Sequence, residues 1–449
     1  MAIFKAYDIR GVVPDELDAD AAYRIGRATA RFLRARRIAV GRDARSSSPE
    51  LTAALVRGIN DEGVDVALLG LVATPMLYFG VEHLGADGGV MVTASHNPAR
   101  YNGFKICREH AIPIGGASGL QEIERLAGES GAPRAAARGR TESADLLGAY
   151  VDHVAKLAPA DPPPFRVAID CGNGMGAVGL VPLLGRLPLV VTRLYFEPDG
   201  TFPNHEADPL KLENLEDVIA AVKSHRADFG VAFDGDGDRA VFIDERGTAV
   251  PSDRITALLA VQQLRRHPGG RVLYDLRSSR STAEAIEAAG GIAEMCRVGH
   301  SFVKAQMRET GAIFAGELSG HLYFRFSPTL VADDGLAAFA AVLDLLATAR
   351  RPLSELVAPL DRYFATGEIN RRVKDVQGLL AAIEAEHRAA GARDISHMDG
   401  LLVTHSDWWF NLRPSNTEPV LRLNLEATTR EKMIAERDRL LARIGESAE

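Results

Sequence analysis

Three regions of the chain repeat one pattern of apolar and polar positions. Each begins with a short run of apolar and β-branched residues, continues with a turn of small and polar residues, and ends with apolar residues at helical spacing. The three copies begin at Arg37, Phe165 and Arg271. We therefore expect a strand, a turn and a helix in each region.

A second apolar run follows each copy and leads directly into a polar cluster. These runs begin at Gly89, Phe229 and Ala312, and they end in TASHNP, DGDGDR and GELSGH. A strand–helix–strand unit makes its two strands parallel and places helices on the faces of the sheet. Because ligands bind at the carboxyl ends of such strands, we expect the three clusters to meet in one cleft.

The repeats and their connectors divide the chain into four parts. Small residues from 128 to 140 and the prolines at 162 to 164 separate the first two copies. The last part ends with two apolar runs around the loop RPSNTEP and with a helix that we expect Thr429 to cap. The predicted fold is α/β, with three related α/β domains of mixed sheets and a smaller α+β C-terminal domain around a central cleft. The expected domains are residues 1–150, 151–253, 254–366 and 367–449.

Charge and hydropathy along the chain argue against nucleic-acid and membrane partners. The 449 residues carry a net charge of −8 without a basic tract, which argues against a nucleic-acid partner. The most apolar stretch, residues 67–81, contains Pro75 and is too short to span a membrane, and the N-terminus has no apolar run typical of a signal peptide. The three cysteines are scattered and predict reduced thiols. We expect a cytoplasmic protein without a nucleic-acid or membrane partner.

The cluster DGDGDR indicates a metal site. It places Asp234, Asp236 and Asp238 at alternate positions, where a divalent cation such as Mg²⁺ would offset their repulsion. The intervening glycines allow the loop to curl around one point. A calcium loop of the EF-hand type would need glycine where this chain has Arg239, and helices where it has strand patterns. A solvated acidic turn is the other alternative.

Ser95, in TASHNP, lies at the end of its predicted strand. On an extended chain His96 would point to the opposite side, which makes it a poor base for Ser95. Ser95 is therefore either a capping serine or the carrier of a phosphoryl group, whose charge a metal would neutralise.

The loop RPSNTEP offers donors that suit a phosphate dianion. Arg413 supplies a fork-shaped cation, and Ser415, Asn416 and Thr417 supply hydroxyl and amide groups. An ordinary polar hairpin turn is the alternative interpretation.

The motifs TASHNP, DGDGDR, GELSGH and RPSNTEP, in this order, resemble those of the α-D-phosphohexomutase superfamily, in its bacterial phosphomannomutase/phosphoglucomutase branch. The opening FKAYDIRG strengthens the resemblance, which covers essentially the whole chain. Membership implies four domains in a heart shape around a central cleft.

The resemblance also implies roles for individual residues. Ser95 would carry the phosphoryl group and would complete a metal site with Asp234, Asp236 and Asp238. The residues near the reacting groups or the sugar would be Tyr7, Arg10, Lys105, Arg239, Arg277, His300, Glu317, Ser319 and His321. Arg413, Ser415, Asn416 and Thr417 would bind the phosphate that is not transferred.

The implied reaction moves phosphate reversibly between O6 and O1 of a hexose, mannose or glucose, through a hexose 1,6-bisphosphate that also acts as activator. One Mg²⁺ per chain is the implied cofactor, and a monomer or weak homo-oligomer is expected. Three alternatives stay open: a mutase for amino-sugar phosphates, a Mg²⁺-dependent sugar phosphatase, and a sugar-phosphate binding protein without turnover.

Overall fold

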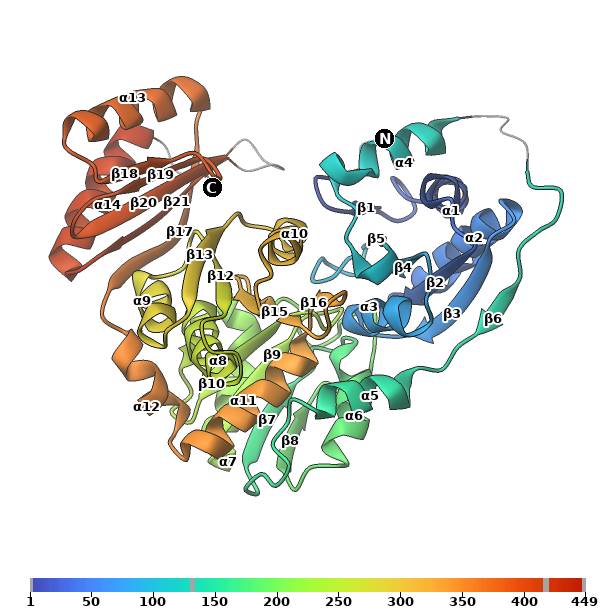
Figure 1. Cartoon of the computed structure of the whole chain (residues 1–449), viewed down its shortest axis with the longest axis horizontal. Coiled ribbons are helices and arrows are strands. Elements are labelled where there is room, and N and C mark those ends of the chain that lie inside the picture. Colours follow the sequence, from blue (N-terminus) through green and yellow to red (C-terminus); the bar gives the residue numbers. More distant parts are fainter. Residues whose placement is uncertain (1–2, 130–133, 415–419, 446–449) are drawn as a thin grey trace.

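The structure, a computed structural model, describes residues 3–129, 134–414 and 420–445. The chain forms four lobes, each built on its own sheet, and together they have the outline of a heart (Figure 1). Domains 1 and 4 form the two upper lobes, and domains 2 and 3 form the body below them (Figure 1). Within the described ranges, none of the helices has the length and apolar character needed to cross a membrane.

Domain 1 contains a six-stranded mixed sheet with the order β1-β5-β4-β2-β3-β6. Strand β2 pairs in parallel with β3 and β4, as the strand–helix–strand pattern predicts, whereas β5 is antiparallel to β1 and β4. Helices α1, α2 and α4 cover one face and α3 covers the other. The elements are β1 (Ile9–Val12), α1 (Ala19–Leu33), β2 (Arg37–Arg42), α2 (Ser48–Asp61), β3 (Asp65–Leu71), α3 (Thr74–His83), β4 (Gly88–Val92), β5 (Tyr101–Arg108), η1 (Glu109–Ala111), η2 (Gly116–Ser118), α4 (Leu120–Gly128), β6 (Thr141–Ser143) and the connecting helix α5 (Leu147–Ala155).

Domain 2 contains a five-stranded sheet with the order β11-β10-β9-β7-β8. Strand β7 is parallel to β8 and β9, and β10 returns antiparallel beside β9, so the aspartate cluster lies in the β9–β10 turn. The elements are β7 (Arg166–Asp170), α6 (Gly176–Leu184), β8 (Val190–Leu194), η3 (Leu212–Leu215), α7 (Glu216–His225), β9 (Phe229–Phe233), β10 (Ala240–Asp244) and β11 (Ala249–Val250).

Domain 3 repeats this plan with the order β13-β12-β14-β15-β16. The motif GELSGH forms the turn between β14 and β15, which are antiparallel. The elements are α8 (Ser252–Arg266), β12 (Arg271–Asp275), α9 (Arg280–Ala288), β13 (Ile292–Cys296), α10 (His300–Thr310), β14 (Phe314–Gly316), β15 (Leu322–Arg325), β16 (Val331–Asp333), α11 (Gly335–Ala349), α12 (Leu353–Val357) and η4 (Ala358–Leu360).

Domain 4 differs from the others because its sheet, β17-β21-β20-β19-β18, is antiparallel throughout. Thr429 caps the last helix by accepting a hydrogen bond from the Lys432 amide, as predicted. The elements are β17 (Phe364–Arg372), α13 (Val376–Ala389), β18 (Asp394–Ser396), β19 (Leu401–Thr404), β20 (Trp408–Pro414), β21 (Val420–Ala427) and α14 (Arg430–Ile444). The predicted fold class is confirmed. The predicted boundaries at 150, 254 and 367 fall inside α5, α8 and β17, which each begin a few residues earlier.

Helix α11 joins the first three domains. Its sequence is apolar on nearly every side, and a helix of that kind must be buried. It packs against α5, α6 and α8, and one continuous hydrophobic cluster runs from α3 of domain 1 through domains 2 and 3. Domain 4 has a separate cluster, formed by residues between 369 and 444. The first three domains therefore form one body, and domain 4 is attached to it.

Two glycines allow a matched test of how domains 1 and 2 meet. A Cβ at Gly200 would lie 2.1 Å from Arg45 Cα and 2.4 Å from the Ala44 carbonyl oxygen, whereas a Cβ at Gly148 in α5 meets nothing within 4 Å. We expect Gly200→Ala to destabilise the protein by about 1–3 kcal/mol through overpacking against backbone. Gly148→Ala should stabilise it by up to about 1 kcal/mol through helix propensity. Thermal unfolding of both variants checks this, and equal melting temperatures would contradict it.

Candidate functional site

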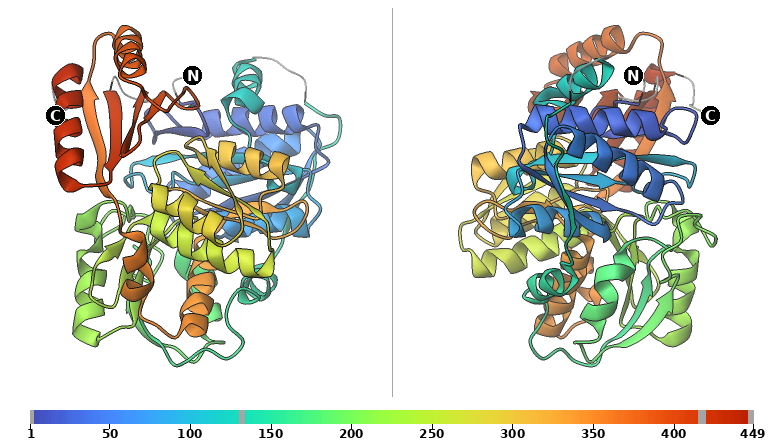
Figure 2. Two further views of the ribbon diagram at one scale, coloured as in Figure 1. Left: turned by 60° about the vertical axis from the view of Figure 1, so that its left-hand side comes forward. Right: turned by 90° about the vertical axis from the view of Figure 1, so that its right-hand side faces the viewer.

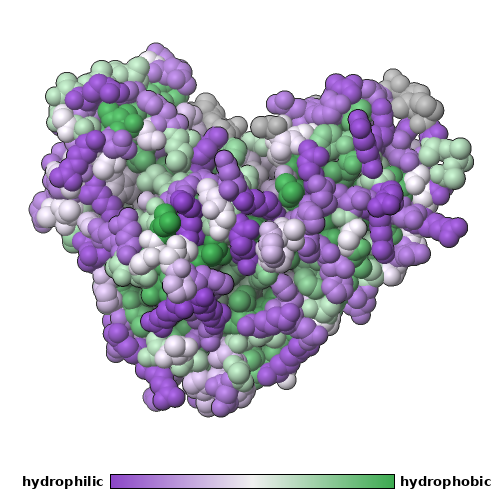
Figure 3. Space-filling model, viewed as in Figure 1, coloured by the Kyte–Doolittle hydropathy of each residue, from purple (hydrophilic) through white to green (hydrophobic). Residues whose placement is uncertain are grey.

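A cavity of about 960 Å³ lies where the four domains meet. The surface view shows a notch between the lobes of domains 1 and 4 (Figure 3). Eleven of the residues that the sequence singled out line this cavity: Tyr7, Arg10, Ser95, Lys105, Arg239, Arg277, His300, Glu317, Ser319, His321 and Arg413. Ser415, Asn416 and Thr417 lie outside the described residues. The three polar clusters thus converge as the repeat predicted.

Ser95 follows β4 in a left-handed backbone conformation with φ of 51°. Its hydroxyl donates to Asp234 Oδ2 at 3.0 Å and lies 3.2 Å from His96 Nδ1. The expectation that His96 points away from Ser95 was wrong, because it assumed an extended chain and the backbone turns at Ser95. Burial lowers the pKa of His96 well below its usual value, and Arg239 lowers it further.

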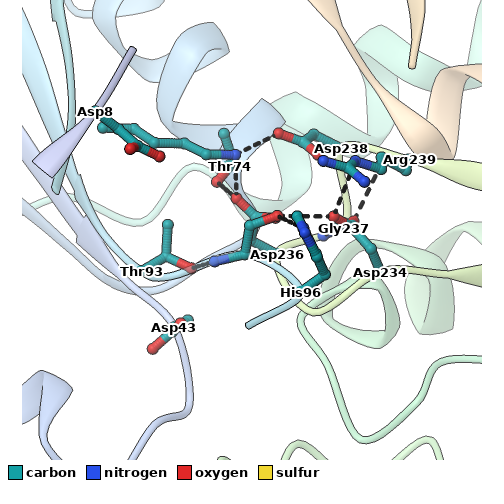
Figure 4. A network of polar contacts seen from close by, with 12 residues as sticks. Asp8, Asp43, Thr74, Thr93, His96, Asp234, Asp236, Gly237, Asp238 and Arg239 are labelled. Carbon is teal, nitrogen blue, oxygen red and sulfur yellow. Dashed lines mark hydrogen bonds and ion pairs between the residues drawn. The ribbon is translucent and has the colours of Figure 1, made fainter. Parts of the chain in front are cut away.

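The three aspartates of the β9–β10 turn are buried close together (Figure 4), and Lys105 is buried in contact with two of them. Lys105 Nζ donates to Asp236 Oδ2 and to Asp238 Oδ2, each at 2.6 Å. The Thr74 hydroxyl donates to Asp236 Oδ2 at 2.6 Å. The amides of Gly237 and Arg239 donate to Asp234 Oδ1 at 3.0 and 3.2 Å, which holds the turn closed around one point.

This group of carboxylates suits a cation. One oxygen of each aspartate lies within 4.8 Å of the others, and all three side chains are buried. Among the described residues, Asp236 Oδ1 and Asp238 Oδ1 have no hydrogen-bond partner, which is costly for buried carboxylates. Hard oxygen donors with this unsatisfied capacity are those that Mg²⁺ prefers.

The surroundings shift the pKa values of two of these carboxylates in opposite directions. Burial raises the pKa of Asp234 well above its usual value, and Asp238 and Asp236 raise it further. Burial also acts to raise the pKa of Asp236, but Lys105 together with the hydroxyls of Thr74 and Ser95 outweighs it, and the net shift is downward. Burial acts to lower the pKa of Lys105, but the three aspartates together outweigh burial, so the pKa is raised and the amine is held as a cation.

Arg239 connects the aspartate turn to the GELSGH turn across the cavity. Its Nε donates to His321 Nε2 at 3.0 Å and lies 3.7 Å from Asp234 Oδ2. On the other side of the ring, His321 Nδ1 is 3.1 Å from Asp333, whose second oxygen accepts from Lys304 Nζ at 2.7 Å. Sequence analysis missed Lys304 and Asp333, which lie in α10 and β16 outside any polar motif.

Glu317 is held by groups of its own domain. The Gly299 amide donates to its Oε1 at 2.7 Å, and the Tyr323 hydroxyl donates to its Oε2. Each carboxylate oxygen can accept a second hydrogen bond, so the side chain can still face a sugar hydroxyl. Beside it, burial lowers the pKa of His300 well below its usual value, and Lys304 lowers it further. Ser319 lines the cavity from the same turn.

Two arginines face the cavity from domain 4. Arg413 on β20 is directly opposite Arg422 on β21. Arg413 donates to Glu368 Oε2 at 3.3 Å, and Arg422 lies 3.3 Å from the other oxygen of Glu368. Arg277 of domain 3 donates to Asp275 at 2.6 Å and also approaches Glu368. Sequence analysis missed Arg422, which lies on the second strand of the predicted hairpin and is paired with Arg413 by the register of the structure.

The Ser95 loop is fixed by a buried arginine that sequence analysis also missed. Arg45 donates to the carbonyl oxygens of Ser95, Asn97, Pro98 and Tyr101 at 2.6–3.0 Å. The sequence did contain a signal for Arg45. It lies in GRDARSSS, which is the polar turn after the first strand of the first repeat. Nearby, Arg10 donates to the side chain of Asn97 at 2.8 Å, and its other nitrogen binds Asp8.

Comparisons with known proteins agree with this geometry. Four family models, the phosphoglucomutase/phosphomannomutase alpha/beta/alpha domains I, II and III and the C-terminal domain, match residues 1–132, 148–247, 251–363 and 368–443. The chain therefore belongs to the phosphoglucomutase/phosphomannomutase family of the α-D-phosphohexomutases, as its motifs predicted. It is a phosphotransferase of the mutase class.

Individual relatives span nearly the whole chain. A phosphomannomutase of Salmonella typhimurium is 41% identical over 436 residues, which cover 95% of both proteins. A phosphoglucomutase of Neisseria gonorrhoeae is 41% identical over 433 residues, 95% of this chain and 93% of the relative. A crystal structure of a phosphoglucomutase/phosphomannomutase family protein from Burkholderia thailandensis superposes with a TM-score of 0.90 at 36% identity, covering 98% of this chain and 96% of that one.

Proposed function

We propose that the protein reversibly interconverts hexose 6-phosphates and hexose 1-phosphates, with mannose, glucose or both as the sugar. Phospho-Ser95 donates its phosphoryl group to the sugar phosphate and gives a hexose 1,6-bisphosphate. This intermediate reverses its orientation in the cavity and returns its other phosphate to Ser95. One observation carries this proposal. The Ser95 hydroxyl lies 3.0 Å from a buried aspartate of the acidic turn, in a cavity that Arg413 and Arg422 line from domain 4.

Asp234, Asp236 and Asp238, with an oxygen of phospho-Ser95, would hold one Mg²⁺ per chain. When bound, the ion would neutralise negative charge on the transferring phosphoryl group. Lys105 and Arg239 add two fixed cations beside Ser95, since Lys105 contacts Asp236 and Asp238 and Arg239 lies near Asp234. Positioning and charge stabilisation of this kind provide most of the catalysis in phosphoryl transfer.

The other phosphate would bind at domain 4. Arg413 and Arg422 present two forked cations, which suit the geometry of a phosphate dianion. We propose that Ser415, Asn416 and Thr417 add donors there. Glu368, which now accepts from Arg413, would compete with the phosphate for these arginines.

The sugar would lie between these two ends. Glu317 and Ser319 would hydrogen-bond its hydroxyls, and His321 and Tyr7 would lie beside them. Burial and nearby Lys304 keep His300 as a neutral imidazole, which can accept a proton from a sugar hydroxyl. Arg10 of domain 1 and Arg277 of domain 3 would contribute positive charge to the cavity.

Ser95 is the first point to test. Incubation with a hexose 1,6-bisphosphate should add one phosphate to the protein, measured as intact mass, and Ser95→Ala should add none. The neighbouring hydroxyl of Thr93 offers a matched control, because its oxygen accepts from the Ser95 amide. Thr93→Val should keep the uptake of phosphate. Stoichiometric phosphorylation of Ser95→Ala would contradict the proposal.

Metal removal should affect turnover far more than folding. Chelation is expected to abolish mutase activity, while Lys105 continues to neutralise Asp236 and Asp238. The melting temperature should therefore fall by no more than about 4 °C, the shift that ~1 kcal/mol produces. Lys105→Met provides the contrast. In chelator its melting temperature should fall much further, because Asp236 and Asp238 then lack both the metal and the lysine. A large loss of structure in the chelated parent would indicate a structural metal instead.

Substrate comparison separates the remaining functions. We expect turnover of glucose 1-phosphate, mannose 1-phosphate or both, with little release of inorganic phosphate. A mutase for amino-sugar phosphates would prefer glucosamine 6-phosphate, and a phosphatase would release phosphate in proportion to the substrate consumed. A coupled enzyme assay of mutase activity with all three sugar phosphates, with inorganic phosphate measured in parallel, decides among these functions.

A further inference from the structure

The orientation of domain 4 does not come from a shared hydrophobic core. Its cluster is formed by residues between 369 and 444, separate from the cluster that unites the other domains. In the left-hand view of Figure 2, domain 4 forms a lobe of its own at the edge of the molecule. Polar contacts therefore contribute strongly to the angle at which domain 4 sits.

The N-terminus of α9 in domain 3 supplies one set of these contacts. The guanidinium of Arg280 donates to the carbonyl oxygens of His405 and Trp408 at 2.9 and 3.0 Å, and to that of Ser406 at 3.3 Å. These oxygens belong to the turn between β19 and β20. A planar guanidinium that binds several carbonyls fixes orientation as well as distance.

A buried carboxylate of domain 4 completes the contact. Glu426 of β21, which is 1% exposed, accepts from the Arg280 backbone amide at 3.0 Å and from Trp409 Nε1 at 3.1 Å. The carboxylate thus lies at the N-terminus of α9, where the helix dipole favours negative charge. Burial raises the pKa of Glu426 above its usual value.

We propose that Arg280 and Glu426 form a latch that sets the angle of domain 4 and thereby places Arg413 and Arg422 for the substrate's non-reacting phosphate. Both are positioning residues, and the proposal rests on the proposed function of the domain 4 arginines. The latch holds the end of the β20–β21 hairpin that contains Trp408 and Glu426, and the arginines lie toward the other end.

The position of Arg413 is sensitive to the angle of domain 4. Arg413 is five residues beyond Trp408 on β20, or about 17 Å at the usual rise of a strand. A tilt of about 10° at the latch would move Arg413 by roughly 3 Å on that length. Such a displacement exceeds the tolerance of a bidentate phosphate contact.

A second anchor keeps domain 4 attached when the latch is broken. Glu284, further along α9, accepts from the Tyr363 hydroxyl at 2.5 Å and pairs with Arg362, both in the connection to β17. Loss of Arg280 should therefore loosen the angle of domain 4 without releasing the domain.

Kinetics of Arg280→Ala test the latch. We expect KM for the hexose phosphate to rise about tenfold or more. The value of kcat should change by less than about threefold, because Ser95 and the acidic turn lie in domains 1 and 2, away from the latch. Glu426→Gln keeps an acceptor and should raise KM less. Arg443→Ala is the matched control, since Arg443 pairs with Glu386 on the surface within domain 4, and its KM should not change.

A distance measurement tests the angle independently of activity. The native cysteines are buried, so spin labels can be attached at Leu212→Cys in domain 2 and Arg439→Cys in domain 4, which are both exposed. Arg280→Ala should broaden the distance distribution between the labels, and Arg443→Ala should leave it narrow. An unchanged distribution, or a broadened one with unchanged KM, would overturn the proposal. Absence of mutase turnover in the parent would overturn the proposed function, and the distances would still decide whether the latch exists.

Discussion

The structure depends on balancing three buried negative charges. Asp234, Asp236 and Asp238 occupy one tight turn, and isolated carboxylates in such a place would be strongly destabilising. The balancing cations come from different parts of the chain. Lys105 reaches the turn from domain 1, and Arg239 belongs to the turn itself. The electrostatic requirement of one loop therefore holds domains 1 and 2 together where Ser95 meets Asp234.

The same junction is sterically tight. A Cβ at Gly235 would lie 2.5 Å from the Ser95 carbonyl oxygen, and Arg45 donates to four carbonyl oxygens of the Ser95 loop. The backbone around Ser95 is thus fixed by the Arg45 guanidinium and by the close approach of Gly235. A group that must meet a phosphoryl centre repeatedly in one geometry benefits from such rigidity, because small displacements cost much of the rate.

The two ends of the cavity are built differently. The serine, the acidic turn and the sugar-facing turn belong to domains that share one hydrophobic cluster around α11. The arginines that face them belong to a domain with its own core. A rigid serine and acidic turn opposite a separately attached domain suit the bisphosphate intermediate that we propose, whose two phosphates exchange places.

The sequence by itself determined the repeat, the fold class and the clusters that meet in the cavity, because strand and helix periodicity and short polar motifs are local properties. It also singled out Ser95, the three aspartates and Arg413, which the structure places in or beside the cavity. Only the tertiary structure revealed Arg45, Lys304 and Asp333, whose partners are far away in the sequence, and the position of His96, which follows from one left-handed residue. The attachment of domain 4 through Arg280 and Glu426 was equally invisible, since 146 positions separate the two residues and no pattern within either segment indicates the other. Contacts of this kind are decided by how whole domains pack, which no local pattern specifies.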